Sequence, residues 1–173
     1  MHTAPGTAFS MWTVPRRTML ALAIAALAAL LLSAGAAQAI QLTPINNAAT
    51  LKECSACHIA FPPQMLPMRS WQALMSHLDK HFGEDASLPK NTVQDIARYL
   101  TSMAADSPTH NEGRVFLRNL PQSETPLRIV DTPIWQMIHG SPANPVFKRP
   151  DITSPANCGA CHQGAAQGQF WGE

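Results

Sequence analysis

Two pentapeptides decide the fold of this chain: Cys54-Ser55-Ala56-Cys57-His58 and Cys158-Gly159-Ala160-Cys161-His162. Both read C-x-x-C-H, the attachment pattern of a c-type haem. Two thiols three residues apart on one helical turn can each add to a vinyl group of the same porphyrin, and the histidine that follows then reaches the iron. The pattern therefore predicts two covalent haems, attached through Cys54, Cys57, Cys158 and Cys161, with His58 and His162 as the proximal iron ligands.

Two other uses of paired cysteines fit the sequence less well. In zinc sites of the paired-cysteine type the pairs usually lie much closer together than here, where they begin 104 residues apart (158 minus 54). A thioredoxin-like redox site needs a βαβ context, and the sequence pattern gives no sign of one. The two motifs use all four cysteines of the chain, and a histidine closes each of them. Chance is therefore a poor explanation for the pair.

The first 39 residues have the pattern of an export signal. Arg16 and Arg17 precede an apolar run of 14 residues from Met19 to Leu32, and Ala37-Gln38-Ala39 is a small-residue cleavage site. A membrane-spanning helix needs about 20 apolar residues, so this run is short for one. We therefore expect residues 1–39 to be a cleaved signal peptide, with an uncleaved anchor as the alternative. Export suits the cysteine pairs, because an oxidising compartment would oxidise two close thiols that were not attached to haem. The signal pattern and the two haem motifs together indicate a bacterial periplasmic protein.

Residues 40–173 are expected to form one domain. Two of the twelve Lys and Arg residues lie before residue 40, and the ten that remain face eleven Asp and Glu residues. This near-neutral balance is not that of a nucleic-acid-binding protein. Thirteen of the fifteen prolines lie in this domain, which favours short helices and many loops. Because so small a chain buries only a modest core, we expect a mostly α-helical, small cytochrome c-type fold of short helices and long loops built around two covalent haems.

Hydrophobic spacing and capping residues predict four short helices in this domain. They cover residues 48–58, 71–82, 92–103 and 133–139. Their expected N-caps are Asn47 or Thr50, Ser70, Asn91 paired with Gln94, and Thr132 followed by Pro133. Gly83 and Gly140 stand where helix C-termini favour glycine. The apolar face of the second helix is expected to hold Trp71, Leu74, Met75, Leu78 and Phe82, and that of the third Val93, Ile96, Ala97 and Leu100.

The segments between these helices are predicted to be irregular. Residues 61–68 contain three prolines and must be extended or turning. Residues 106–126 are polar and rich in turn formers, and Phe116 and Leu117 are their expected inward-pointing side chains. Residues 141–155 contain four prolines and are expected to form a wrapped loop ahead of the second haem motif.

The sixth iron ligands decide what the haems can do, and His81 and His139 are the preferred candidates. On a helical wheel His81 lies closer than His77 to the apolar face of residues 71–82. His139 lies four residues after Trp135 in its helix. His81 and His139 also each stand 23 residues from a proximal histidine and within two residues of a following glycine.

Other side chains compete for the sixth position. His77 is expected to point toward solvent, and His110 lies in a polar loop where a solvated histidine is common. Methionine also serves as an axial haem ligand, so two methionines in the proline-rich loop remain alternatives, Met65 and Met68. Met75 lies on a helical stripe, where methionine more often fills a core.

Four stretches of the chain resemble the small periplasmic dihaem cytochromes c of purple bacteria and related proteobacteria: residues 53–63, 69–75, 81–88 and 156–162. These are the dihaem electron partners of an oxygen-binding monohaem cytochrome called SHP. The resemblance covers nearly all of residues 40–173. It implies a mostly α-helical fold built around haem, low reduction potentials and two low-spin haems with two histidines each. It also implies that the distal histidines are His81 and His139.

These features predict an electron-transfer protein and no enzyme activity. If each iron holds a proximal and a distal side chain, no coordination site is open to a substrate. The expected donor is a membrane b-type cytochrome or a quinol system, and the expected acceptor is the soluble oxygen-binding monohaem cytochrome or another periplasmic haem protein. The protein is expected to be a monomer that binds no nucleic acid.

Two other functions stay open. One is a small peroxidase or reductase with one five-coordinate haem, and the other is a haem-based sensor whose distal ligand is displaced. Binding of carbon monoxide to the reduced protein separates the enzyme from the carrier, and a redox-dependent ligand switch identifies the sensor.

Overall fold

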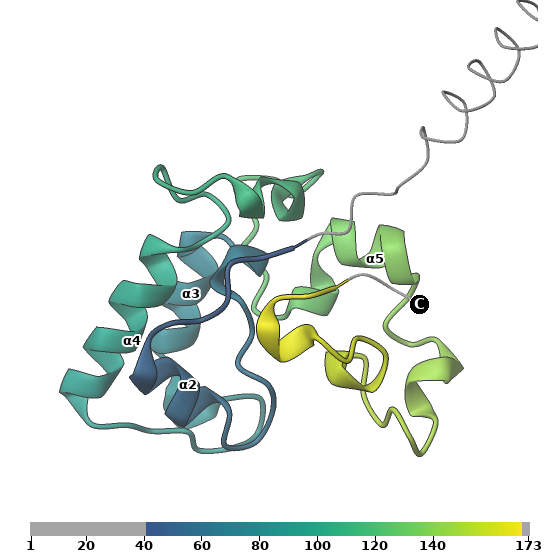
Figure 1. Ribbon diagram of the computed structural model, residues 1–173, viewed down its shortest axis with the longest axis horizontal. Coiled ribbons are helices and arrows are strands. Elements are labelled where there is room, and N and C mark those ends of the chain that lie inside the picture. The colour runs from purple at the N-terminus through teal and green to yellow at the C-terminus, as the bar shows by residue number, and fades with distance from the viewer. Residues whose placement is uncertain (1–40, 171–173) are drawn as a thin grey trace, which may run out of the picture. The chain divides into compact units, whose positions relative to one another are not determined.

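The computed structural model describes residues 41–170, and its larger core lies where α3 (Met68–Met75) packs against α4 (Lys90–Ser102). Figure 1 shows these two helices side by side, with α2 (Ala48–Cys54) next to them. The core is filled by buried side chains of both helices and of the segments beside them, among them Leu66, Trp71, Met75, Ile96, Leu100 and Ala104. Trp71 also donates its indole N–H to Pro63 O at 2.7 Å, which fixes the proline-rich loop against α3.

A second, smaller core joins the beginning of the domain to its centre. It is formed by buried side chains from five separate segments: Leu42, Met65, Ala105, Phe116 and Ile134. The amide of Ala105 donates to Leu66 O at 3.0 Å and links this core to the first. Gly113 lies so close to Ala105 and to Gln64 O that no side chain fits there. The segment around Phe116 is therefore held tightly against the proline-rich loop, as its predicted inward orientation requires.

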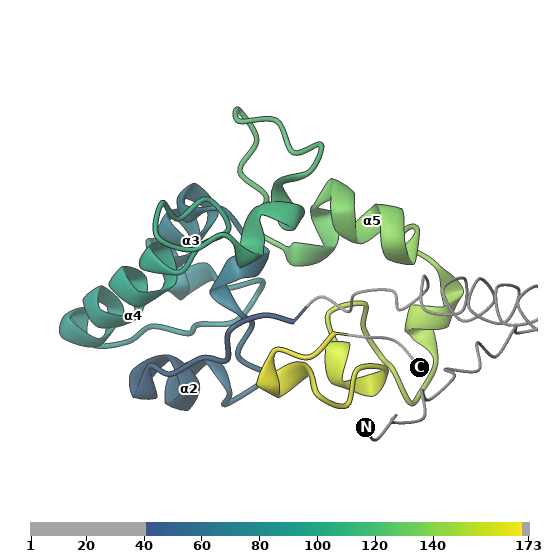
Figure 2. The ribbon, with the colours of Figure 1, turned by 45° about the horizontal axis from the view of Figure 1, so that its top comes forward.

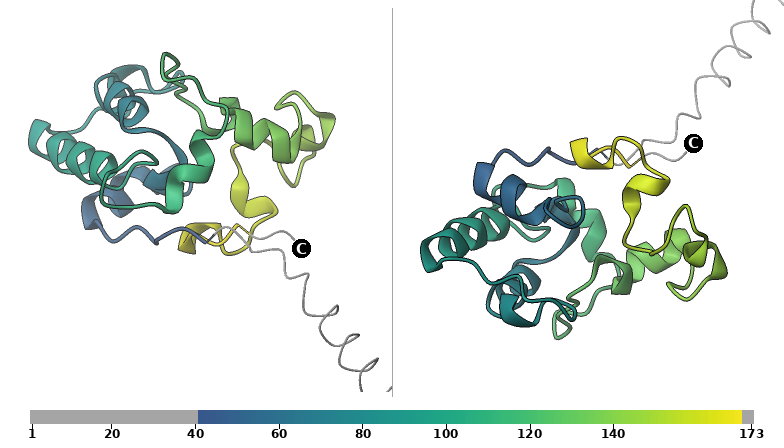
Figure 3. Two further views of the ribbon diagram at one scale, coloured as in Figure 1. Left: turned by 90° about the horizontal axis from the view of Figure 1, so that it is seen from above. Right: turned by 90° about the horizontal axis from the view of Figure 1, so that it is seen from below.

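The domain's last third is built from α5 (Pro133–His139) and short 3-10 turns. Its end returns to the beginning of the domain, since Leu42 N donates to Gly168 O at 2.9 Å and Gln41 forms an isolated bridge with Gln169. Figure 3 shows these two ends of the described chain running side by side. The domain is thus closed by contacts between its first and last segments.

Regular structure within residues 41–170 is helical, with isolated bridges but no β-strand, as the sequence predicted. The 3-10 turns are η1 (Pro63–Met65), η2 (Leu78–Lys80), η3 (Glu112–Leu117), η4 (Ile129–Asp131), η5 (Pro145–Lys148), η6 (Cys158–Ala160) and η7 (Ala165–Gln167). Figure 2 shows the loop between η3 and η4 rising away from the helices. Arg69 holds this loop by donating to Glu124 O and to Pro121 O at 2.6 and 3.1 Å.

Local signals placed α5 correctly. Thr132 caps it, Pro133 is its first residue and Gly140, with φ of 77°, ends it, as predicted. α4 begins at Lys90 after Pro89, two residues earlier than predicted, and no side chain caps it. The predicted capping role of Asn91 is therefore wrong.

The second predicted helix is wrong at both ends. α3 begins at Met68, so Ser70 lies inside the helix and does not cap it. A side chain from a distant segment caps the N-terminus of α3, because Met68 N donates to the carboxylate of Asp106 at 2.6 Å. α3 ends at Met75, and Phe82, predicted to be buried on the same helix, is 46% exposed.

The expected signal peptide, residues 1–39, lies outside the described residues. None of the helices between residues 41 and 170 is long and apolar enough to cross a membrane.

Candidate haem sites

The first C-x-x-C-H motif stands at the end of α2. Asn47 caps this helix, since its side-chain oxygen accepts hydrogen bonds from the backbone N–H and the hydroxyl of Thr50 at 2.7 and 2.8 Å. The predicted helix, which ran to His58, is too long, because α2 ends at Cys54. Ser55 is its C-cap residue and donates its backbone N–H to Leu51 O. Serine favours such ends because its hydroxyl competes with helical hydrogen bonds. Cys54 is therefore half-buried on the helix, and Cys57 is exposed on the turn that follows.

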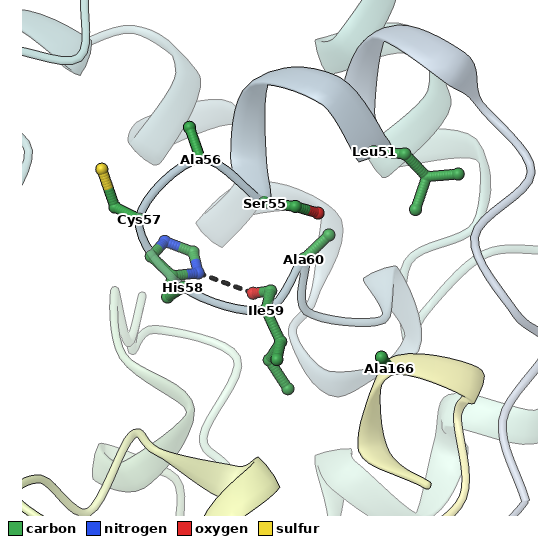
Figure 4. Close-up of a pocket in the computed structure, with 8 residues that line it drawn as sticks. All are labelled: Leu51, Ser55, Ala56, Cys57, His58, Ile59, Ala60 and Ala166. Atoms are coloured by element: carbon green, nitrogen blue, oxygen red, sulfur yellow. Dashed lines mark hydrogen bonds between the residues drawn. The ribbon is translucent and has the colours of Figure 1, made fainter.

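His58 is oriented by its own neighbours. Its Nδ1 lies 2.6 Å from Ile59 O, and because a carbonyl oxygen only accepts, Nδ1 carries the proton and leaves Nε2 free to bind a metal. The ring of Phe61 stacks on the imidazole with centres 4.8 Å apart. Figure 4 shows His58 and Cys57 on the same turn, at a pocket that Ala166 of η7 also lines.

His81 faces His58 from a tight turn after α3. The turn is closed by two hydrogen bonds, His81 N to Glu84 O at 2.8 Å and Glu84 N to His81 O at 3.1 Å. Gly83, with φ of 104°, has a backbone conformation that other residues rarely adopt. The imidazole centres of His81 and His58 lie 6.2 Å apart, and their planes differ by 20°. Burial, and secondarily the neighbouring His58, lower the pKa of His81, which favours the neutral, metal-binding imidazole.

His77 is turned away from this pair. The hydroxyl of Ser76 donates to Ala73 O at 2.8 Å, and His77 Nδ1 lies 3.2 Å from the same carbonyl. These bonds compete with continuation of the helix, which explains why α3 stops at Met75. The helical-wheel argument therefore does not apply to residues 77–82, although His81, and not His77, is the histidine that lies opposite His58.

The second C-x-x-C-H motif forms a single helical turn. η6 begins at Cys158, and the amide of His162 donates to Cys158 O at 2.8 Å. Cys158 is half-buried and Cys161 is exposed, the same arrangement as in the first motif. Burial raises the pKa of Cys158 to about 11 and also raises that of Cys54. Burial therefore favours the neutral thiol at both positions.

His139 lies opposite His162 at the end of α5. The two imidazole centres are 6.1 Å apart, and their planes differ by 84°. His139 donates from Nδ1 to Trp135 O at 3.1 Å, which leaves its Nε2 free. The pKa of His139 is lowered, mainly by burial. The Nδ1 of His162 is buried and has no hydrogen-bond partner within residues 41–170. The ring centres of His162 and Phe170 lie 5.7 Å apart.

The competing ligand candidates are engaged elsewhere. Met65 is buried in the smaller core, and Met68 packs against the larger one, so both act as apolar filling. Met75 is also part of the larger core, as predicted. His110 Nδ1 lies 3.9 Å from a carboxylate oxygen of Glu112, in a partly exposed loop.

The two histidine pairs fit a six-coordinate haem iron. A metal–imidazole bond is about 2 Å long, and the ring centre lies about 1 Å behind the ligating nitrogen, so two imidazoles on opposite sides of one metal have centres about 6 Å apart. The observed separations are 6.2 and 6.1 Å. Each pair also has two unbridged cysteines beside its proximal member. The sequence predicted these eight residues, but it did not show how the rings are oriented or which aromatic side chains pack on them.

Comparisons with known proteins agree with this arrangement. The family model for dihaem cytochrome c matches residues 50–170. Among solved structures, a dihaem cytochrome c from Rhodobacter sphaeroides is 44% identical, covers 74% of this chain and 99% of its own, and has a TM-score of 0.66. A second structure from that organism is 40% identical, with 73% and 99% covered and a TM-score of 0.60.

A more distant relative comes from another genus. The dihaem cytochrome c of Shewanella baltica OS155 is 28% identical, covers 72% of this chain and 87% of its own, and has a TM-score of 0.58. A comparison with curated protein sequences found no match.

Proposed function

Because the chain belongs to the dihaem cytochrome c family and carries two covalent c-type haems, we propose that it is an electron carrier whose two haems are each ligated by two histidines. The observation that carries this proposal is the pair of facing imidazoles at each motif, with ring centres 6.2 and 6.1 Å apart. In this proposal His58 and His81 hold one iron, and His162 and His139 hold the other. The sequence left a crossed pairing open, and the observed proximities favour the uncrossed one.

When bound, each haem supplies an iron that takes up and releases one electron. The chain fixes the ligands for this task. His58 and His139 each use Nδ1 to bind a backbone carbonyl, which orients the ring and leaves Nε2 for the iron. Two imidazole ligands stabilise ferric iron better than a pair with a methionine thioether does, so low reduction potentials are expected. With both axial positions filled by the chain, neither site is open to a substrate.

The two sites are joined by a short piece of chain. Ala166 of η7 lines the pocket at His58 and lies only four residues after His162, the proximal histidine of the other site. The amide of Ala165 donates to His162 O at 2.9 Å, which holds this segment close to the second motif. We infer that electrons pass between the two sites within one molecule, without an intermediate carrier.

The cellular setting and the partners are proposals that rest on the sequence alone. The export pattern of residues 1–39 supports a periplasmic location. The family resemblance supports a soluble oxygen-binding monohaem cytochrome, or another periplasmic haem protein, as acceptor and a membrane b-type cytochrome or quinol system as donor. We propose that the carrier works as a monomer.

Carbon monoxide binding tests the ligand assignment. The reduced wild-type protein is expected to bind none, because both sixth positions are occupied. His81→Ala and His139→Ala should each keep two attached haems and bind one carbon monoxide per molecule. His77→Ala is the matched control and should behave as the wild type.

Two results would refute the proposal. Stoichiometric binding by the wild type would point to an enzyme or a sensor with an open or displaceable ligand. Binding by His77→Ala, with His81→Ala inert, would mean that the distal ligand is the wrong histidine.

A further inference from the structure

The two histidine pairs have the same separation but different relative orientations. At the first site the imidazole planes of His58 and His81 differ by 20° and are nearly parallel. At the second site the planes of His139 and His162 differ by 84° and are nearly perpendicular. The difference cannot follow from the C-x-x-C-H motif, because both sites share it. It must arise from what surrounds each ring.

At the second site, Trp135 holds the ring of His139 in two ways. The indole and the imidazole are stacked, with centres 4.7 Å apart and planes 16° apart. The backbone carbonyl of the same tryptophan accepts the Nδ1 hydrogen of His139 at 3.1 Å. Both contacts span four residues, one turn of α5, and therefore act on the same side of the histidine. Together they fix the rotation of the imidazole about its bond to the chain.

The indole itself is well anchored. Trp135 is 7% exposed, and the ring of Phe147 from η5 lies 5.4 Å away at a tilt of 41°. At the first site, no indole from residues 41–170 packs on the distal ring in this way. His81 instead touches the edge of Phe82, with planes 64° apart, and Phe82 is half exposed. Of the two distal histidines, His139 is therefore the one that a stacked ring supports, whereas at the first site the stacked ring, Phe61, lies on the proximal His58.

The relative orientation of two axial imidazoles has an electronic consequence. Each imidazole donates π electron density into the iron d orbital that lies perpendicular to its own ring plane. The iron has two d orbitals of this kind, at right angles to each other. Parallel rings act on the same one of the two and separate its energy from that of the other. Perpendicular rings act on different orbitals and leave the two close in energy. This splitting determines the electron paramagnetic resonance spectrum of low-spin ferric haem.

We propose that Trp135 is a positioning residue that holds the His139 imidazole at about a right angle to that of His162, so that the two haems are electronically distinct. The haem at His58 has well-separated d orbitals and gives a rhombic signal with three resolved g values. The haem at His162 has nearly degenerate orbitals and gives a signal with one large g value at low field. This inference rests on the proposed histidine ligation of both irons.

Electron paramagnetic resonance of the frozen, oxidised holoprotein tests this inference. The wild type should give the rhombic and the large-g signals, each accounting for one haem. In Trp135→Leu the large-g feature should shift toward smaller g or broaden, and the rhombic signal should stay unchanged. Trp135→Phe keeps an aromatic ring for stacking and should retain the wild-type spectrum. Trp71→Leu, an equally buried tryptophan of the larger core, is the matched control and should leave both signals unchanged.

The outcomes separate this inference from the proposed ligation. Two rhombic signals in the wild type would overturn the inference while leaving histidine ligation intact, and this test needs no variant to fold. An unchanged large-g signal in Trp135→Leu would overturn the positioning role. A high-spin signal in the wild type would instead overturn the proposed ligation itself.

Discussion

Removing the Thr132 hydroxyl should destabilise the helix that presents His139. Thr132 is fully buried at the N-cap of α5. Its hydroxyl donates to Ile129 O at 2.7 Å and accepts from Trp135 N at 3.4 Å. In Thr132→Val the shape is kept, but the buried amide of Trp135 loses its acceptor and Ile129 O loses one of its donors. The variant therefore isolates the two hydrogen bonds from the packing.

The expected loss follows from these contacts. An N-cap contributes about 0.5–2 kcal/mol, and a buried donor left without a partner costs about 1–3 kcal/mol. The bond to Trp135 is long and contributes little, whereas the one to Ile129 is short, so we expect a total loss of about 1–2 kcal/mol. For a domain of this size that corresponds to a fall in Tm of about 4–8 °C.

Thermal unfolding of the oxidised holoprotein, followed by circular dichroism, measures this loss. Thr132→Ser is the matched control, because it keeps the hydroxyl and removes only a methyl group, which should cost about 0.8 kcal/mol. The valine variant should therefore be the less stable of the two. If the serine variant unfolded at the lower temperature, packing and not capping would be the role of Thr132, and the account of α5 would be wrong.

Three further predictions concern the haem, a close backbone contact and pH. Replacing Cys158 and Cys161 by Ala should leave a protein that fails to accumulate or unfolds without cooperativity, and unchanged thermal stability would show that the second haem is not part of the core. In Gly113→Ala the new Cβ would lie 2.5 Å from Ala105 Cα and 2.6 Å from Gln64 O, so chemical denaturation should show a loss of about 1–3 kcal/mol. Burial raises the pKa of Tyr99 above its usual 10.0, so above that pH the unfolded chain loses the phenol proton more readily than the folded protein does. The free energy of unfolding should therefore fall as the pH rises above 10.0, and it should fall less steeply in Tyr99→Phe. Equal slopes for the two proteins would contradict this.

The sequence was sufficient where all the determinants of an element are local. α5 has its cap, its first proline and its terminal glycine within one stretch of nine residues, 132–140, and its bounds were predicted correctly. The two haem motifs are local in the same sense. Their spacing encodes the attachment chemistry directly, so the cofactor and the family could be predicted from the residues alone.

Prediction failed where the determinants lie far apart in the chain. α3 begins at Met68 because the carboxylate of Asp106, 38 residues away, accepts the amide hydrogen of Met68. No local sequence pattern predicts this contact. The same helix ends early because Ser76 and His77 bind back to Ala73 O. His81 therefore reaches His58 through a turn and not along a helical face. The orientation of each imidazole pair depends on such tertiary contacts as well, so it was beyond sequence-based reasoning.

Near-infrared magnetic circular dichroism of the oxidised protein tests the central claim most directly. The energy of the ferric charge-transfer band in this region identifies the pair of axial ligands on each low-spin haem. We predict a single bis-imidazole band with the intensity of two haems per chain, from His58 with His81 and His162 with His139. A band at the energy of histidine–methionine ligation, a high-spin band, or the intensity of one haem would contradict the account.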